Sequence, residues 1–173
     1  MATTSILIPE ADIHQRIKSL AAEIEKDYPP SEEIHLVAVL KGGFMFMADL
    51  VRAMSDRVTM DFMAVSSYGK GTTSSGQVRV LKDLDSNLEG RHIIVVEDIV
   101  DTGLTLHYLQ DLLKARAPKS VKTACLLSKP SRRKVDVQVD YIGFTIEDRF
   151  VVGYGLDYAE KYRNLPYIAV LEQ

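Results

Sequence analysis

The feature that constrains the fold most is the segment at residues 91–97, whose centre, residues 93–96, is entirely apolar. A strand without alternation of polar and apolar residues is typical of a parallel sheet, where helices cover both faces. Residues 104–115 follow with a helical pattern, and residues 121–127 form the next apolar run. Strands that alternate with helices indicate an α/β protein with a mostly parallel sheet. The segment therefore predicts a central, fully buried strand.

The rest of the chain continues this alternation. Residues 9–28 begin with Pro9, which suits a first helical position, and carry apolar residues at helical spacing. The other predicted elements are strands at residues 34–40, 58–66 and 77–81, a helix at residues 44–54, and weaker strands at residues 141–145 and 167–171. The predicted inner faces are Ile13, Ile17, Leu20, Ala21 and Ile24 in the first helix, and Leu104, Leu109, Leu112 and Leu113 in the helix at residues 104–115. Ligands of such sheets bind beyond the carboxyl ends of the strands, so we expect the functional residues there.

Length and composition bound the class of protein. The 173 residues predict one domain that spans residues 1–173. The single cysteine, Cys125, lies in an apolar run, which favours a buried, inert thiol and a reducing compartment. The formal net charge of -3 argues against a nucleic-acid partner, and we expect neither a signal peptide nor a membrane span. We therefore expect a cytoplasmic protein that acts on small molecules.

The end of the central strand carries the strongest functional pattern. Glu97, Asp98 and Asp101 are three carboxylates within five positions, and small or hydroxylated residues follow at the start of the predicted helix. Backbone N–H groups at a helix N-terminus, with hydroxyl side chains beside them, form an anion site. Gly103 allows a close backbone approach to a ligand or a positive φ. The pattern predicts an acidic, glycine-containing phosphate cradle.

The carboxylates conflict with a phosphate ligand, because like charges repel strongly in a partly buried site. The conflict is removed if the carboxylates accept hydrogen bonds from sugar hydroxyls or share a divalent cation with the ligand. A phosphorylated sugar with Mg²⁺ meets both conditions. The alternative is that Glu97 and Asp98 are an N-cap cluster favoured by the helix dipole, and for either residue alone that would be the better interpretation.

Residues 95–105 (VVEDIVDTGLT) resemble the phosphoribosyl pyrophosphate (PRPP) signature of type I phosphoribosyltransferases, and in particular of the hypoxanthine(-guanine) phosphoribosyltransferases. The resemblance implies that Glu97 and Asp98 meet the ribose hydroxyls and that Asp101 is the general base near the purine imidazole nitrogen. It implies contacts to PRPP from Glu97, Asp98, Asp101, Thr102, Gly103, Leu104 and Thr105, with residues 101–105 around the 5′-phosphate. Leu104 stands where some members, notably mammalian ones, carry a lysine. The family fold is a mostly parallel central sheet flanked by helices, with a small hood built from the chain termini.

The resemblance extends to the pyrophosphate side of the site. Residues 40–43 (LKGG) resemble the family's pyrophosphate loop, in which Lys41 and Gly42 offer main-chain contacts and a non-proline cis peptide often precedes the lysine. Residues 66–76 resemble the mobile active-site loop, and their Gly, Ser and Thr content independently favours mobility. The implied pyrophosphate contacts are Lys41, Gly42, Ser67, Tyr68 and Arg163.

The purine side rests on the resemblance alone. A lysine at the position of Lys129 reads the purine 6-oxo group in the family, whereas residues 130–134 are otherwise interpreted as a solvated turn. Phe150 would stack on the base, Val151 would bind it through its backbone, and Asp157 would reach a Mg²⁺ through oxygen or water. The implied purine-binding residues are Lys129, Phe150, Val151 and Asp157, and the implied metal ligands are Asp157, Glu97 and Asp98, the last two through water.

Together these features predict a Mg²⁺-dependent purine salvage enzyme. It would transfer the 5-phosphoribosyl group of PRPP to N9 of a 6-oxopurine, hypoxanthine or guanine, and release pyrophosphate. Family membership implies a homodimer or homotetramer. Two alternatives stay open at the level of sequence: a phosphoribosyltransferase for adenine, xanthine or a pyrimidine, and a non-catalytic regulator that senses PRPP on the same fold.

Overall fold

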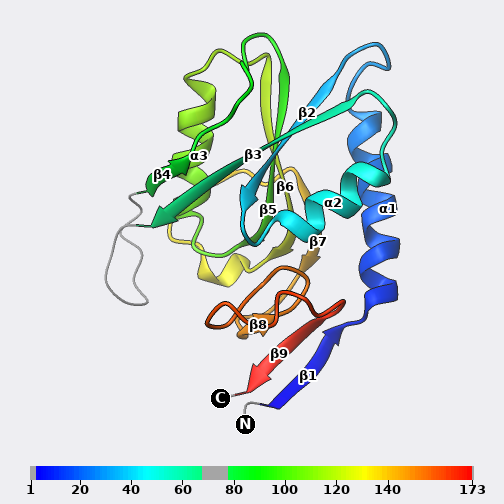
Figure 1. The fold of residues 1–173 in the computed structure, drawn as a ribbon, viewed down its shortest axis with the longest axis vertical. Coiled ribbons are helices and arrows are strands. Elements are labelled where there is room, and N and C mark those ends of the chain that lie inside the picture. Colours follow the sequence, from blue (N-terminus) through cyan, green and yellow to red (C-terminus); the bar gives the residue numbers. More distant parts are fainter. Residues whose placement is uncertain (1–2, 68–77, 173) are drawn as a thin grey trace.

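The computed structural model describes residues 3–67 and 78–172, which form a six-stranded sheet with helices on both faces and a smaller sheet beside it (Figure 1). The strand order of the large sheet is β4-β3-β2-β5-β6-β7. All neighbouring strands in it are parallel except β4, which runs antiparallel to β3. The strands are β2 (Ile34–Leu40), β3 (Val58–Ser67), β4 (Val78–Lys82), β5 (His92–Val100), β6 (Ser120–Ser128) and β7 (Tyr141–Thr145). The predicted α/β class with a mostly parallel sheet is confirmed.

The helices divide into two layers. In Figure 1, α1 (Glu10–Lys26) and α2 (Phe44–Arg52) lie on one side of the sheet and α3 (Leu104–Lys114) lies on the other. Successive β5 residues point to opposite layers: Ile94 and Val96 pack in the core cluster with α1 and α2, whereas Ile93 and Val95 pack in the cluster with α3. The apolar centre of β5 is therefore buried on both faces, as its lack of alternation predicts.

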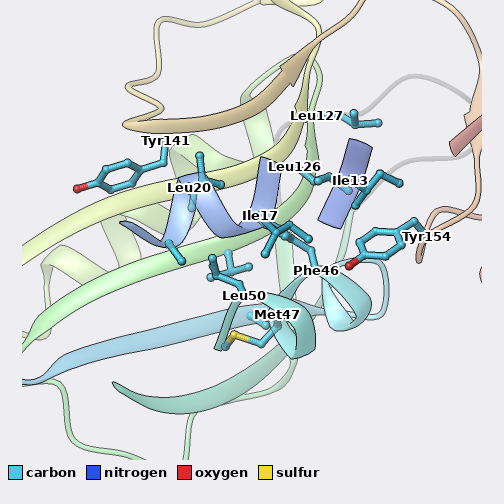
Figure 2. Packing of buried hydrophobic residues seen from close by; sticks show 14 of the residues in the cluster. Ile13, Ile17, Leu20, Phe46, Met47, Leu50, Leu126, Leu127, Tyr141 and Tyr154 are labelled. Carbon is cyan, nitrogen blue, oxygen red and sulfur yellow. The ribbon is translucent and has the colours of Figure 1, made fainter. Parts of the chain in front are cut away.

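The inner face of α1 is the predicted one, since Ile13, Ile17, Leu20, Ala21 and Ile24 are all buried. Figure 2 shows side chains of this face packed towards α2 and towards residues of β6 and β7. The helix starts one residue later than expected, because Pro9 is the N-cap and not the first helical residue. Cys125 is fully buried, and burial raises the pKa of its thiol to about 12, which keeps it protonated and inert.

Two predictions near the functional strand were wrong. β5 continues to Val100, three residues beyond the predicted end at Glu97, because its ladder with β6 extends to the pair Val100–Ser128. The inner face of α3 also differs: its buried residues are Leu106, Leu109, Gln110 and Leu113, whereas Leu104 and Leu112 are only partly buried. Gln110 is buried because its side-chain amide donates to Thr123 Oγ1 at 3.0 Å and to the Gln138 carbonyl at 2.9 Å.

The smaller sheet is the hood, and it is built from the two ends of the chain. Its strands are β1 (Thr3–Ile8), β8 (Val151–Val152) and β9 (Ile168–Glu172), in the order β1-β9-β8 with antiparallel pairing. Figure 1 shows the two termini side by side below the large sheet. A hood from the chain termini was expected from the family resemblance, but β1 was not predicted from its own residues. In the described part of the chain, no helix has the length and apolar character that a membrane crossing requires.

The α1–α2 core supplies a stability prediction. Leu20 is fully buried in that core, so Leu20→Ala should lower the free energy of unfolding by about 2–5 kcal/mol through lost transfer energy and a residual cavity. Leu81 on β4 is 59% exposed, and the same substitution there should change it by less than about 0.5 kcal/mol. Urea unfolding of both variants measures the difference, and equal effects would contradict the assignment of this core.

Candidate active site

The functional residues predicted from sequence gather at one edge of the large sheet. The parallel strands β2, β5, β6 and β7 all end there, and the segments that follow them meet the hood. The contact is close: a Cβ atom added to Gly155 in the hood would lie 2.3 Å from the carbonyl oxygen of Gly42. The hood therefore packs directly against the loop that follows β2. A non-proline cis peptide joins Leu40 to Lys41 in that loop.

Two carboxylates occupy the end of β5 itself. Glu97 is 7% exposed, and burial together with the neighbouring Asp98 charge raises its carboxyl pKa well above the ordinary value. Burial also raises the pKa of Asp98 to about 6, although its Oδ1 accepts a hydrogen bond from the Ile99 N–H at 2.8 Å. The empty protein therefore holds two carboxyl groups that lack an adequate partner for their charge. A cation or a row of hydroxyl donors would relieve this cost.

Gly42 packs onto one of these carboxylates. A Cβ atom at Gly42 would lie 1.9 Å from Asp98 Oδ2, far inside a van der Waals contact. The loop after β2 can approach Asp98 this closely only because residue 42 has no side chain. The predicted ribose-binding and pyrophosphate-binding segments are thus in direct contact.

A cavity of about 100 Å³ lies where β5 passes into α3. It is lined by Glu97, Ile99, Val100, Asp101, Thr102, Gly103, Thr105 and Leu106, so five of the seven predicted PRPP contacts line it and Asp98 and Leu104 do not. Gly103 is the N-cap of α3 with φ 85° and provides no side-chain cap, although the Leu104 N–H donates to Thr102 Oγ1 at 3.4 Å. The N-terminus of α3 thus lies at the cavity. Glu97 and Asp98 lie within β5, so the alternative that they cap the helix is wrong.

The pyrophosphate side is a group of charged residues between the β2 loop and the hood. Arg163 Nη1 donates to the Gly155 carbonyl at 2.7 Å, and its Nη2 lies 3.4 Å from Asp157 Oδ1. Glu160 lies between the two predicted cationic residues, with one oxygen 3.0 Å from Lys41 Nζ and the other 3.3 Å from Arg163 Nη2. Arg163 Nε is buried without a hydrogen-bond partner among the described residues. The structure therefore brings Lys41, Asp157 and Arg163 together around Glu160.

The purine side contains a second group of charges. Arg132 Nε donates to Asp101 Oδ1 at 2.9 Å, and Lys129 Nζ lies 3.6 Å from Asp148 Oδ1. Lys129 follows β6 directly, and its side chain is only 8% exposed. Phe150 is 46% exposed, and its ring meets Tyr158 edge-on with 5.7 Å between the centroids. Its neighbour Val151 is buried in β8, where its backbone pairs with Val170.

Arg133 is the site residue that sequence reasoning missed. Its guanidinium donates at 2.8 Å to the carbonyls of Val100 and Asp101 and to Ser128 Oγ, so it joins the ends of β5 and β6. Residues 130–134 are therefore not simply a solvated turn, and a short 3₁₀ helix, Pro130–Arg132, begins the segment. No signal in the sequence distinguishes Arg133 from the charged residues beside it, because two of its partners are backbone carbonyls more than 30 positions away.

Parts of the predicted site remain outside this description. Tyr68 and the predicted mobile loop up to residue 76 lie outside the described residues, and Ser67 is the last residue of β3. Within residues 3–67 and 78–172, no three His, Cys, Asp or Glu side chains are arranged to hold a metal ion by themselves. Any ion bound by Glu97, Asp98 or Asp157 would thus need further ligands from water or substrate.

Comparison with known proteins decides the family. The model of the phosphoribosyl transferase domain matches residues 9–159. This chain belongs to the phosphoribosyl transferase family. It is 52% identical over 167 residues to the hypoxanthine-guanine phosphoribosyltransferase of Bacillus subtilis (strain 168), a match that covers 96% of this chain and 92% of that protein.

Solved phosphoribosyltransferases share the fold as well. A hypoxanthine-guanine phosphoribosyltransferase of Bacillus anthracis superposes with a TM-score of 0.93 at 52% identity, over 97% of this chain and 98% of that one. The hypoxanthine phosphoribosyl transferase of Trypanosoma cruzi superposes with a TM-score of 0.90 at 48% identity, over 97% and 91% of the two chains. The resemblance seen in residues 95–105 therefore holds for the whole chain.

The raised pKa of Asp98 gives this family member a testable pH dependence. Its folded pKa of about 6 exceeds the ordinary 3.8, so the stability it contributes is present below pH 3.8 and is lost as the pH rises through 6. Asp98→Asn removes the buried charge, so at pH 8 it should raise the free energy of unfolding of the ligand-free protein by about 1 kcal/mol or more. The gain should shrink at pH 5. Asp85→Asn, at a side chain 86% exposed, is the control and should show no such trend; a loss of stability in Asp98→Asn at pH 8 would contradict the raised pKa.

Proposed function

We propose that the protein is a purine salvage enzyme that transfers the 5-phosphoribosyl group of PRPP to N9 of hypoxanthine and guanine. The products are the nucleoside 5′-monophosphate and pyrophosphate. The observation that carries this proposal is the cavity at the end of β5, where carboxylates and residues at the N-terminus of α3 line the same space. Relatives that are about half identical over almost the whole chain carry the hypoxanthine-guanine name, which supports the choice of base.

The residues around β5 bind the phosphorylated sugar. The backbone of residues 101–105 and the hydroxyls of Thr102 and Thr105 donate to the 5′-phosphate, because helix N-termini favour anions. Glu97 and Asp98 accept hydrogen bonds from the ribose hydroxyls. Lys41 and Gly42 provide backbone contacts to the pyrophosphate, and Arg163 provides its guanidinium as a planar donor fork. Ser67, the last residue of β3, and Tyr68, which lies outside the described residues, complete this set.

Mg²⁺ is the cofactor that we propose, and the donor set fits it in chemistry. Mg²⁺ prefers oxygen ligands and keeps waters and substrate phosphates among them, which agrees with a protein that offers separate carboxylates and no complete cage. Glu97, Asp98 and Asp157 are the residues that would hold it, the first two through water. When bound, the ion would offset the negative charge that develops on the departing pyrophosphate. Burial raises the pKa of both Glu97 and Asp98, although the Arg163 charge lowers that of Asp98, and a bound cation would further favour their charged forms.

The segments after β6 and β7 receive the base. Lys129 donates to the purine 6-oxo group, Phe150 stacks on the ring, and Val151 binds the base through its backbone. Asp101 accepts the proton that the imidazole part of the purine loses as N9 attacks the anomeric carbon. A 6-oxopurine presents both groups that this pair needs, an acceptor for Lys129 and a proton for Asp101.

We further propose that residues 1–173 act as one domain, that the enzyme is a homodimer or homotetramer, and that it works in the cytoplasm without nucleic-acid or membrane partners. Phe44 at the start of α2 and Ile6 on β1 are 48% and 58% exposed, which supports burial of apolar surface between subunits. The Trypanosoma cruzi relative was studied for the role of its C-terminal region in its oligomeric state, which supports the same view.

An assay with separate bases tests the proposed function. The protein with PRPP and Mg²⁺ should convert hypoxanthine and guanine to nucleotides with equimolar pyrophosphate, whereas adenine and uracil should give none. Chelation of divalent cations should abolish turnover, and added Mg²⁺ should restore it. Absence of product with every base, despite PRPP binding by calorimetry, would instead support a PRPP-sensing regulator. Product from adenine, xanthine or uracil would reassign the base.

The role of Asp101 has its own test. Asp101→Asn should lower kcat by about 10²–10⁴, the usual contribution of a general base, while PRPP binding changes little. The exposed Asp136 provides a matched control, since Asp136→Asn should leave both quantities unchanged. If kcat persists while PRPP affinity collapses, Asp101 is a ligand of the sugar phosphate and not the base.

A further inference from the structure

Four charged side chains with alternating signs form a row along the purine side of the site. Asp101 Oδ1 lies 2.9 Å from Arg132 Nε, Arg132 Nη1 lies 3.5 Å from Asp148 Oδ2, and Asp148 Oδ1 lies 3.6 Å from Lys129 Nζ. The two ends of the row are the residues proposed above to take the purine proton and to bind its 6-oxo group. The two middle residues, Arg132 and Asp148, have no role in the proposed reaction.

The backbone places this row, so it does not depend on the reach of long side chains alone. The Lys129 N–H donates to the Val100 carbonyl at 3.0 Å, which sets the start of the 3₁₀ turn beside the end of β5. The Arg132 N–H then donates to the Lys129 carbonyl at 3.1 Å. Arg133 holds the same junction through the carbonyls of Val100 and Asp101. The Arg132 side chain consequently extends from this turn to Asp101.

Burial differs along the row. The Lys129 side chain is 8% exposed, and an ammonium group that is buried to this extent needs an acceptor. Among the described residues, Asp148 provides the carboxylate that forms an ion pair with it, at 3.6 Å. Asp101, Arg132 and Asp148 are 40%, 43% and 51% exposed, so their ion pairs are screened by water and are weak enough to exchange with a ligand.

We propose that Arg132 and Asp148 compete with the base, because in the ligand-free enzyme they engage the two groups that read it. This inference rests on the proposed function. A 6-oxopurine replaces both contacts, because its oxo group takes the place of Asp148 at Lys129 and its ring N–H takes the place of Arg132 at Asp101. A 6-aminopurine presents a donor where Lys129 needs an acceptor, so Lys129 stays with Asp148 and the base is rejected. The resident pair thus lowers the affinity for a 6-oxopurine by the free energy of the two contacts that the base has to displace.

Steady-state kinetics of Arg132→Gln and Asp148→Asn at saturating PRPP and Mg²⁺ test this proposal. Each variant removes one resident contact, so the KM for hypoxanthine should fall about two- to fivefold, the factor expected for a partly exposed ion pair. The KM for PRPP should stay within about twofold of the wild type, because neither residue lies on the pyrophosphate side. The double variant should show less than the product of the two single effects, since both belong to one row.

Two neighbours in the same segment are matched controls. Glu147 and Arg149 flank Asp148 and are exposed, and no side-chain contact joins them to Asp101 or Lys129 in the described structure. Glu147→Gln and Arg149→Gln should leave the KM for hypoxanthine unchanged, and circular dichroism should show native folding in all variants. A raised or unchanged KM for hypoxanthine in Arg132→Gln and Asp148→Asn overturns the inference alone. Absence of turnover in the wild type overturns the proposed function and this inference with it.

Discussion

A strand that is buried on both faces has little room for charged side chains, yet β5 carries Glu97 and Asp98 near its carboxyl end, where its ladder with β6 still continues to Val100. Its centre serves two cores at once, because alternate residues pack under α1 and α2 or under α3. Parallel pairing with β2 and β6 brings the ends of three strands to the same edge. The acidic pair, the glycine loop after β2 and the lysine after β6 are therefore neighbours as a consequence of the sheet. Each part of the candidate site depends on this arrangement of β5.

The acidic pair is costly for the empty protein and useful for a ligand. Burial raises the pKa values of both carboxyl groups, which means that their charged forms lose more solvation than the surrounding donors replace. Gly42 adds to this burial because its backbone lies where a larger residue would displace Asp98. A ligand that brings hydroxyl donors and a cation replaces the solvation that burial removes. Relief of this unfavourable burial of the two carboxylates then contributes to the binding free energy. Stability and function make opposite demands on these two residues.

Elements whose burial follows their own periodicity were predictable. The bounds of β2 and β7 and the inner face of α1 agree with the sequence, since apolar spacing reflects packing directly. The end of β5 was not predictable, because two carboxylates usually indicate a loop and only the ladder with β6 extends the strand. β1 is held by β9, more than 150 positions away, and its own residues carry no comparable signal. In the site, the motif and the family resemblance predicted roles for Asp101 and Lys129, but the contacts of Arg132, Arg133, Asp148 and Glu160 join segments that only the fold brings together.

The hood has a consequence for the order in which the molecule is completed during synthesis. β9 lies between β1 and β8, so the sheet that carries Val151 cannot close until residues near 172 have left the ribosome. All strands of the large sheet, with the cradle at Gly103, are translated before that point. A nascent chain can thus form the part of the site at the end of β5 first. The segment around Phe150 comes later, because β8 still lacks its partner strand β9. Residues 168–172 thus complete the hood only after the large sheet has been translated.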